Sequence, residues 1–267
     1  DYEFSSNRIN ILLLGADSSV ERVEAGMNFR TDTMILVTVD FDNKKVDMIS
    51  IPRDSYVRIN NGSRFNKINA AFTFGGGREG DGYEYAMNTV SYLLGVPVDY
   101  YVGFGMNVVK EVVDAMGGVW FDVPRNMNYD DPYQDLHIHQ EKGYRLLTGD
   151  DAMQVLRYRH DNDMRYGYPD GDLGRIKTQQ AFLTAMVDQL LQIKNVTKIN
   201  QFIQVFQNNV ETDLSFQNIL WFAQQAILGG LSMENVEFVT MPNRTASCWS
   251  RTYHNYQSYV VHWKIDH

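Results

Sequence analysis

The hydrophobic pattern of this chain changes from a strand-like to a helix-like period, and this change limits the folds that it can adopt. Short runs rich in Ile, Val and aromatic residues predict strands, and apolar residues three and four apart predict helices. The predicted strands are residues 9–14, 34–40, 46–51, 99–104 and 119–123. The predicted helices are residues 83–94, 107–116, 178–193 and 216–228. We therefore expect an α/β fold, a three-layer α/β/α arrangement with helices on both faces of a central sheet.

The central sheet is expected to be mixed. The runs at 34–40 and 46–51 are joined through Asn43, which is too short a link for a crossover, so they should form an antiparallel hairpin. The glycines at 75–77 and the segment 126–140 are the predicted mobile loops. The sequence has no internal repeat and no convincing boundary, which predicts a single domain over residues 1–267.

Composition narrows the range of partners. The formal net charge of -9 argues against nucleic acid, because binding to a phosphate backbone needs a basic face. Cys248 is the only cysteine, so neither an internal disulfide nor a thiolate zinc cluster is expected. No run approaches the roughly 20 apolar residues that span a bilayer. The start without methionine, directly before the first predicted strand, is what a chain trimmed of an N-terminal segment would show.

Arginine and aspartate nevertheless occur close together at three places, namely residues 30–33, 157–159 and 172–179. Arginine presents paired donors that match phosphate oxygens, and paired aspartates suit a hard divalent cation. The combination predicts a site for a metal-bridged polyphosphate. Such a site serves phosphoryl chemistry, or at least binds a pyrophosphate.

Each upstream candidate also has a purely structural interpretation. Asp17 follows the end of a strand, where α/β sheets present ligand groups, but it suits a turn or a helix N-cap equally well. Arg30 and Asp32 project to one side of an extended chain, so that an anion-binding group and a metal ligand share a face. The alternative is an exposed ion pair worth ~1 kcal/mol or less. Arg53, after a strand and a proline, and Lys67 suit phosphate binding or ordinary solvated surface positions.

The downstream candidates surround two predicted helices. A short helix from residue 148 runs into Arg157 and Arg159, which point the same way if the chain is extended there. Asp172 precedes a helix N-terminus that favours an anion, and Arg175 and Gln179 lie four residues apart on one helical face. The alternative is a polar stripe that only keeps the helix soluble.

Two histidines are the last candidate residues, and the absence of several motifs disfavours some classes of enzyme. His137 and His139 alternate as two metal ligands on a strand would, but no third ligand follows at a useful spacing, so loop histidines are expected. The sequence contains no phosphate loop, no dinucleotide-binding glycine motif, no nucleophile elbow and no H-E-x-x-H. A nucleotide kinase, a dehydrogenase, a serine hydrolase and a zinc protease are therefore disfavoured.

Seven segments, taken in order, resemble the LytR-CpsA-Psr (LCP) family of bacterial envelope proteins: residues 11–17, 30–34, 50–54, 67–71, 113–119, 157–160 and 172–175. The resemblance covers roughly residues 10–191. It implies an extracytoplasmic catalytic domain on the cell membrane of a Gram-positive bacterium, tethered through an N-terminal membrane helix that is absent here. The implied enzyme is a phosphotransferase that moves a phosphoglycan, such as wall teichoic acid, capsule or another secondary wall polysaccharide, from a polyprenyl pyrophosphate lipid to peptidoglycan.

The resemblance also implies roles for particular residues. The family's metal-binding carboxylates fall on Asp17 and Asp32, and Mg²⁺, or Mn²⁺, is the implied cofactor. Its catalytic and pyrophosphate-binding arginines fall on Arg30, Arg53, Arg157, Arg159 and Arg175. Further polar positions of the same pocket fall on Lys67, Asp172 and Gln179. The prenyl tail implies an apolar tunnel, for which residues 83–94 and 178–191 are the candidates.

One departure from the family affects the expected specificity. The interval between Arg159 and Asp172 is longer than the family pattern, which leaves the acceptor and the glycan open. Three functions remain compatible with the sequence: a phosphoglycan transferase, a pyrophosphatase that hydrolyses the same lipid-linked bond, and a non-catalytic module that binds lipid pyrophosphate. The general base stays open as well.

Overall fold

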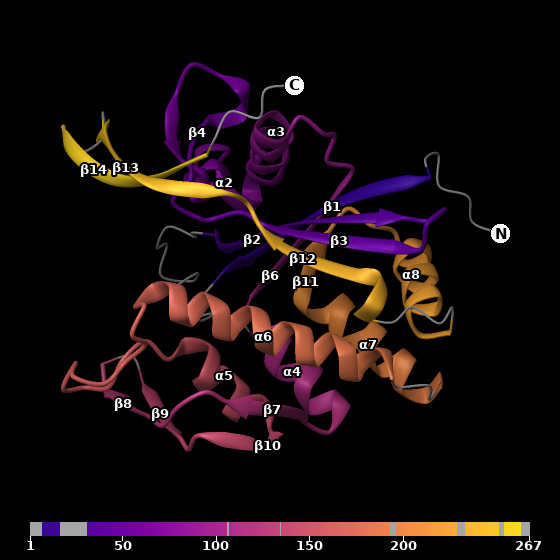
Figure 1. Ribbon diagram of the computed structural model, residues 1–267. Helices are drawn as coiled ribbons and strands as arrows, with labels where there is room; N and C mark the ends of the chain where they lie inside the picture. The colour runs from indigo at the N-terminus through magenta and orange to yellow at the C-terminus, as the bar shows by residue number, and fades with distance from the viewer. Residues whose placement is uncertain are drawn as a thin grey trace. The chain divides into compact units, whose positions relative to one another are not determined.

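The computed structural model (Figure 1) describes residues 7–16, 31–105, 107–133, 135–192, 196–228, 233–250 and 254–262. The chain forms two compact units. The first unit comprises Asp1–Gly105, Val210–Ile219 and Glu234–His267, and the second comprises Met106–Asn209 and Leu220–Met233. The chain therefore leaves the first unit and returns to it twice.

A six-stranded sheet with the order β11-β6-β1-β2-β3-β12 forms the centre of the first unit (Figure 1). Its strands are β1 (Arg8–Ala16), β2 (Thr31–Asp40), β3 (Lys45–Ser50), β6 (Tyr100–Gly105), β11 (Val210–Thr212) and β12 (Val236–Thr240). The pairs β1/β2, β2/β3 and β6/β11 are antiparallel, whereas β1/β6 and β3/β12 are parallel. The structure thus confirms the α/β class, the mixed central sheet and the predicted β2/β3 hairpin.

Two helices, α2 (Ala71–Phe74) and α3 (Gly82–Leu94), pack on one face of this sheet. Alternate residues of β1, among them Leu12 and Leu14, contact Ala86 and Val90 of α3 in a single buried cluster. This follows from the two-residue period of a strand and the helical period of α3. Full burial of each aliphatic side chain contributes ~1.5–3 kcal/mol, so the sheet and α3 stabilise each other.

The rest of the first unit consists of short elements beside the sheet. One small hairpin is β4 (Tyr56–Arg58) with β5 (Phe65–Lys67), and another is β13 (Asn243–Ser250) with β14 (Asn255–His262). The ring of Tyr56 lies 4.8 Å from that of Tyr259, which joins the two hairpins. Single turns of 3-10 helix are η1 (Ile59–Asn61), η2 (Ile68–Ala70) and η3 (Gly77–Glu79). In η4 (Met233–Asn235) the sequence passes from the second unit back to the first.

The second unit is mainly helical and has its own core. Its helices are α4 (Asn107–Met116), α5 (Gly149–Arg157), α6 (Asp172–Leu191), α7 (Val196–Asn209) and most of α8 (Phe216–Leu228). Its strand pairs are β7 (Val119–Val123) with β10 (Gly143–Leu147), and β8 (Met127–Asp131) with β9 (Leu136–Gln140). Phe121 of β7 and Phe182 of α6 meet edge to face, with ring centroids 5.3 Å apart, inside this core.

Most predicted elements occur where the sequence placed them, but one prediction was wrong. The segment 126–140 contains the β8/β9 hairpin rather than a loop, because Met127 and Ile138 are buried in the core of the second unit. Helix α6 begins at Asp172, six residues before the start predicted from periodicity. Of the helices that the structure describes, none combines the length and apolar character needed to cross a membrane.

Candidate functional site

Four predicted site residues cannot be located from their side chains. Asp17 and Arg30 lie outside the described residues. Asp32 belongs to β2 and Asp172 opens α6, but the side chains of both also lie outside the description. The assignment of Asp17 and Asp32 as a metal-binding pair therefore stays a prediction.

In the first unit, Arg53 and Lys67 come together around one carboxylate. Lys67 Nζ lies 2.7 Å from Asp54 Oδ1, and Arg53 Nε lies 3.9 Å from Asp54 Oδ2. Pairing of β4 with β5 places Lys67 opposite Tyr56. Lys67 therefore reaches the same carboxylate as Arg53, which lies 14 residues earlier in the sequence. We call Arg53, Asp54 and Lys67 the Asp54 cluster. Sequence reasoning missed Asp54 as the carboxylate that joins the two cations.

The turn that carries Arg53 is fixed by bonds from the C-terminal hairpin. Ser55 is fully buried, and its hydroxyl donates to the Pro52 carbonyl at 2.6 Å. Its Oγ also lies 2.6 Å from His262 Nε2 of β14. The amide of Val260 donates to the Asp54 carbonyl at 3.0 Å. These bonds fix the backbone that carries Arg53 before any ligand binds, which lowers the entropic cost of binding.

In the second unit, the arginines Arg157 and Arg159 flank a buried tyrosine. Helix α5 begins with a capping box, in which the Thr148 side chain accepts from the Asp151 amide while the Asp151 carboxylate accepts from the Thr148 amide. The helix ends at Arg157, and Tyr158 is extended with φ -62° and ψ 135°. Because Tyr158 is fully buried while Arg159 is exposed and Arg157 is half-buried, the two arginines alternate with an inward-facing ring.

Helix α6 brings two further candidates to the end of α5. Gln179 Nε2 donates to the Leu156 carbonyl at 3.0 Å, one residue before Arg157. Arg175 lies one helical turn earlier and acts electrostatically on the hydroxyl of Tyr168. Helix α6 therefore brings Gln179 to the arginine-bearing end of α5 and Arg175 to Tyr168, whose ring packs against Tyr158. Gln179 fixes the helix contact and is already bonded to backbone.

Two tyrosines and one unpredicted arginine complete this region. The rings of Tyr158 and Tyr168 meet edge to face at 5.7 Å, and Arg125 lies over the Tyr168 ring at 5.7 Å. Gly174 allows this packing, because a Cβ there would lie 2.5 Å from the Cβ of Tyr168. Arg125 directly follows the Pro124 that ends β7, an arrangement like that of Pro52 and Arg53, and this likeness was the signal that could have found it. The tyrosine–arginine cluster is defined as Arg125, Arg157, Tyr158, Arg159, Tyr168 and Arg175.

Burial sets the ionisation of the two phenols. It raises the pKa of Tyr158, and the hydrogen bond from its hydroxyl to Asp161 at 2.6 Å raises it further. It also raises the pKa of Tyr168, while the charges of Arg125 and Arg175 act in the opposite direction. Both phenols are therefore protonated at neutral pH. A neutral phenol beside guanidinium groups leaves their positive charge available to an anion.

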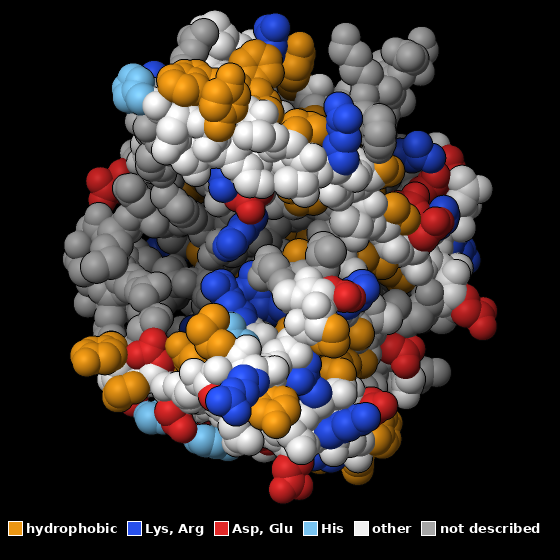
Figure 2. All heavy atoms as spheres, turned by 60° about the vertical axis from the view of Figure 1, so that its left-hand side comes forward, with side chains coloured by type: hydrophobic (Ala, Val, Ile, Leu, Met, Phe, Trp, Pro, Cys, Tyr) orange, Lys and Arg blue, Asp and Glu red, His pale blue; other side chains and the backbone are white. Residues whose placement is uncertain are grey.

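The long interval after Arg159 packs on the β8/β9 hairpin. The Asn128 amide donates to Asp161 Oδ1 at 3.0 Å, and the Asp130 amide donates to Asn162 Oδ1 at 2.8 Å. The same hairpin carries His137 and His139 in β9, so the prediction of loop histidines was wrong. Figure 2 shows histidine side chains in pale blue at the surface beside Asp or Glu side chains in red, and Lys and Arg side chains in blue elsewhere on that face.

This chain is similar to bacterial proteins that are named as teichoic acid transferases. It is 32% identical over 232 residues to the polyisoprenyl-teichoic acid–peptidoglycan teichoic acid transferase TagU of Bacillus subtilis, covering 86% of this chain and 68% of that protein. It is 33% identical over 211 residues to TagU of Enterococcus faecalis, covering 79% of this chain. The chain spans 63% of the length of that Enterococcus relative.

The fold similarity extends over nearly the whole chain. The crystal structure of Bacillus subtilis TagV superposes with a TM-score of 0.74 at 26% identity, over 97% of this chain and 92% of that one. The model of the LytR_cpsA_psr family matches residues 2–265, well beyond the part in which the resemblance was visible by inspection. With the relatives in agreement, the chain belongs to the LytR_cpsA_psr family.

Proposed function

We propose that this protein transfers a phosphoglycan from a polyprenyl pyrophosphate carrier to peptidoglycan. The observation that carries the proposal is the similarity to TagU over 232 residues at 32% identity, since that relative is named as a teichoic acid transferase. Wall teichoic acid is accordingly the first donor to test, with capsule and other secondary wall polysaccharides as further donors. The long interval after Arg159 is where we expect the specificity for glycan and acceptor to differ from that of the relatives.

The geometry of the tyrosine–arginine cluster supports this proposal. The pyrophosphate diester gains charge on the departing lipid phosphate as its bond to the glycan phosphate breaks. Guanidinium groups of Arg157 and Arg175 stabilise that charge without a covalent intermediate. The protonated phenols of Tyr158 and Tyr168 shape the site and exclude water from it. Arg125 lies over the ring of Tyr168 and adds a third positive charge.

The Asp54 cluster offers a second place for phosphate oxygens. Arg53 and Lys67 are each about one-third exposed, with 34% of the side-chain surface accessible, so a ligand can reach both. Arginine presents a planar pair of donors and lysine a compact point charge, and phosphate accepts from either. Asp54 holds both cations in place and competes with phosphate for them.

Mg²⁺ is the proposed cofactor, with Asp17 and Asp32 as its protein ligands and Mn²⁺ as an alternative. These residues offer oxygen donors only, which fits a hard cation rather than zinc. When bound, the ion would neutralise pyrophosphate oxygens and so complement the arginines. Arg30, between the two carboxylates in sequence, would bind the same anion.

The proposed partners follow from the same chemistry. The donor is a polyprenyl pyrophosphate lipid that carries the glycopolymer, and the acceptor is a sugar hydroxyl of peptidoglycan. A protein with these partners works at the extracytoplasmic face of the membrane of a Gram-positive bacterium, through an N-terminal membrane helix. Two alternatives use the same residues: hydrolysis of the lipid-linked pyrophosphate, and binding of the lipid without catalysis.

One incubation separates the three functions. A lipid-linked phosphoglycan is mixed with the protein and Mg²⁺, with and without peptidoglycan, and the products are separated by size and analysed by mass spectrometry. A covalent conjugate that forms only with peptidoglycan is the expected result. Release of free phosphoglycan in both samples means hydrolysis, and an unchanged donor that co-purifies with the protein means binding alone; either result overturns the proposal.

A matched pair of variants ties the activity to the cluster. Arg157→Ala/Arg159→Ala removes two charges from the proposed site, whereas Arg58→Ala/Arg64→Ala removes two charges from the β4/β5 hairpin, where the side chains lie over Phe65 and Phe74. Transfer should fail in the first variant and continue in the second, with circular dichroism showing that both are folded. Equal activity of the two variants would contradict the assignment of the site.

A further inference from the structure

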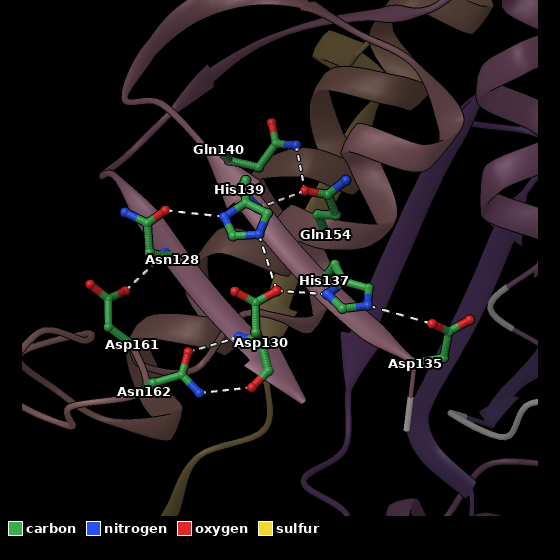
Figure 3. A network of polar contacts seen from close by, with 9 residues as sticks. All are labelled: Asn128, Asp130, Asp135, His137, His139, Gln140, Gln154, Asp161 and Asn162. Atoms are coloured by element: carbon green, nitrogen blue, oxygen red, sulfur yellow. Dashed lines mark hydrogen bonds and ion pairs between the residues drawn. The ribbon is translucent and has the colours of Figure 1, made fainter. Parts of the chain in front are cut away.

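The outer face of the β8/β9 hairpin brings two histidines and a carboxylate together (Figure 3). Asp130 lies directly opposite His137, and Asn128 lies opposite His139, in the antiparallel register of the two strands. These four positions fall on one face because alternate residues of a strand point to the same side. Among the described residues, Asp130, His137 and His139 are the group of three whose ligand atoms all lie within 4.8 Å of one another.

The distances between these atoms are close to those of a metal site. Asp130 Oδ1 lies 2.6 Å from His137 Nδ1 and 3.1 Å from His139 Nε2. Bonds of about 2.0–2.2 Å in a tetrahedral arrangement separate ligand atoms by roughly 3.3 Å. A small rotation of His137 therefore opens enough room for an ion. The three side chains are about half exposed, which leaves a fourth position open to solvent.

Each histidine also has an acceptor for the proton on its other ring nitrogen. His137 Nε2 lies 3.5 Å from Asp135 Oδ1, and His139 Nδ1 lies 3.3 Å from Asn128 Oδ1 (Figure 3). Metal-bound imidazoles almost always donate their second N–H to a carboxylate, a carbonyl or water, which fixes the tautomer and the ring. An ion bound to the two nitrogens that face Asp130 would therefore leave the ring protons on the nitrogens that face Asp135 and Asn128.

The hairpin is a rigid support for such a site. Met127 and Ile138, on its inner face, are buried in the core of the second unit. Asn162 bonds both backbone groups of Asp130, with its Oδ1 accepting from the amide at 2.8 Å and its Nδ2 donating to the carbonyl at 2.8 Å. The His139 amide donates to Gln154 of α5 at 2.9 Å. Ligands on strands held this firmly keep their geometry better than ligands on loops.

We propose that Asp130, His137 and His139 bind one divalent transition-metal ion, with Zn²⁺ as the defining probe. Two imidazoles and one carboxylate suit Zn²⁺, whereas Mg²⁺ requires oxygen ligands. Three protein ligands leave the fourth tetrahedral position to water or to an anionic oxygen. This site is separate from Asp17 and Asp32, and it does not depend on the proposed transferase activity.

Calorimetric titration of the untagged, metal-free chain with Zn²⁺ at pH 7.5 tests the proposal. The wild type should bind one ion at this site, and an excess of Mg²⁺ should not displace it. His137→Ala/His139→Ala should lose that ion. The matched control is His254→Asn, which removes an exposed imidazole on the turn of another hairpin and keeps a residue that tolerates its φ of 51°.

The supporting residues provide a finer test. Asn128→Ala and Asp135→Gly should each weaken Zn²⁺ binding about 10-fold or more without changing its stoichiometry, because these side chains only orient the ligands and glycine tolerates the φ of 48° at residue 135. Zn²⁺ should raise the melting temperature of the wild type and of His254→Asn, since it binds the native hairpin alone. It should not do so in the double histidine variant. Binding that survives in the double variant with unchanged affinity, or that is lost in His254→Asn, would overturn the site.

Discussion

The Asp54 cluster and the tyrosine–arginine cluster both gather cationic side chains, but they surround them with different groups. In the first, Lys67 contacts Asp54 at 2.7 Å, so a carboxylate already neutralises part of the charge. In the second, Arg125 and Arg175 act on buried phenols that stay protonated, and the nearby Asp161 accepts from Tyr158 and from the Asn128 amide. The second cluster therefore has more cations, and its phenols carry no charge that would neutralise them, so we expect it to dominate phosphate binding.

The largest effect is expected from Arg157→Ala/Arg159→Ala. The affinity for a short-chain prenyl pyrophosphate should fall by at least ~2 kcal/mol, taking ~1–3 kcal/mol for each charged hydrogen bond and allowing for overlap. The corresponding loss is about 30-fold in the dissociation constant, measured by calorimetry. Arg53→Ala/Lys67→Ala removes as many charges from the Asp54 cluster and should cost less. If the two losses are equal, the contrast between the clusters is wrong.

Tyr158→Phe tests the role of the buried phenol. Removing the hydroxyl should lower the free energy of unfolding at pH 7 by about 1–2 kcal/mol, because Asp161 loses a hydrogen-bond donor. Since burial raises the pKa of Tyr158 in the folded state, its contribution is complete below the unfolded pKa of about 10 and is lost as pH rises further.

Urea unfolding between pH 7 and pH 11 measures this difference. The gap in stability between wild type and Tyr158→Phe should shrink above about pH 10, the ordinary pKa of tyrosine. Tyr92→Phe, at a ring that is 51% exposed on α3, is the matched control and should leave stability unchanged at every pH. A gap that widens with pH would contradict the inferred direction of the pKa.

A smaller effect is expected from Gly174→Ala, in which a gain in helix propensity and a loss in packing act in opposite directions. Alanine favours a helix over glycine by ~1 kcal/mol, but its Cβ would lie 2.5 Å from that of Tyr168, and such crowding costs typically ~1–3 kcal/mol. A net loss of roughly 1 kcal/mol in unfolding free energy follows. Donor affinity should fall with it, because Tyr168 moves away from Arg175. Gly105→Ala, where a Cβ would meet nothing within 4 Å, should not affect donor affinity.

The smallest effect is expected from Asp54→Asn in the first unit. The ion pair of Lys67 and Asp54 is about one-third exposed, so its loss should change stability by less than ~1 kcal/mol. Binding of inorganic pyrophosphate should become up to about five-fold tighter, because Arg53 and Lys67 no longer share a carboxylate. Weaker binding would show that Asp54 supports the cations more than it competes with them.

Much of the fold was predictable because short sequence patterns indicate its individual helices and strands. The capped start of α5, the amphipathic period of α3 and α4, and the aliphatic runs of β1 and β2 are visible within a few residues of sequence. The β8/β9 hairpin was missed because, although Met127 and Tyr129, like Leu136 and Ile138, alternate with polar residues as in a half-buried strand, each alternation contains only two apolar residues. Strand β11 has three residues, too few to show any period.

The candidate site likewise contains residues that the sequence could predict and residues that it could not. Arg157, Arg159 and Gln179 could be placed from helix ends and helix faces, and the family resemblance implied their roles. Asp54 as a shared carboxylate and Arg125 beside Tyr168 depend on contacts between segments distant in sequence, which no local pattern specifies. The group of Asp130, His137 and His139 needed the register of two strands before its third ligand became visible.

The order of strands in the central sheet has a consequence for biosynthesis. Its outermost strands, β11 and β12, come from residues 210–212 and 236–240, and they pair with β6 and β3. A nascent chain that has been made only as far as residue 209 therefore presents two strands with unpaired backbone groups, which can join the strands of another chain. Ribosomal stalling or premature termination before residue 240 should yield aggregating fragments, so cellular yield depends on rapid completion of the C-terminal quarter.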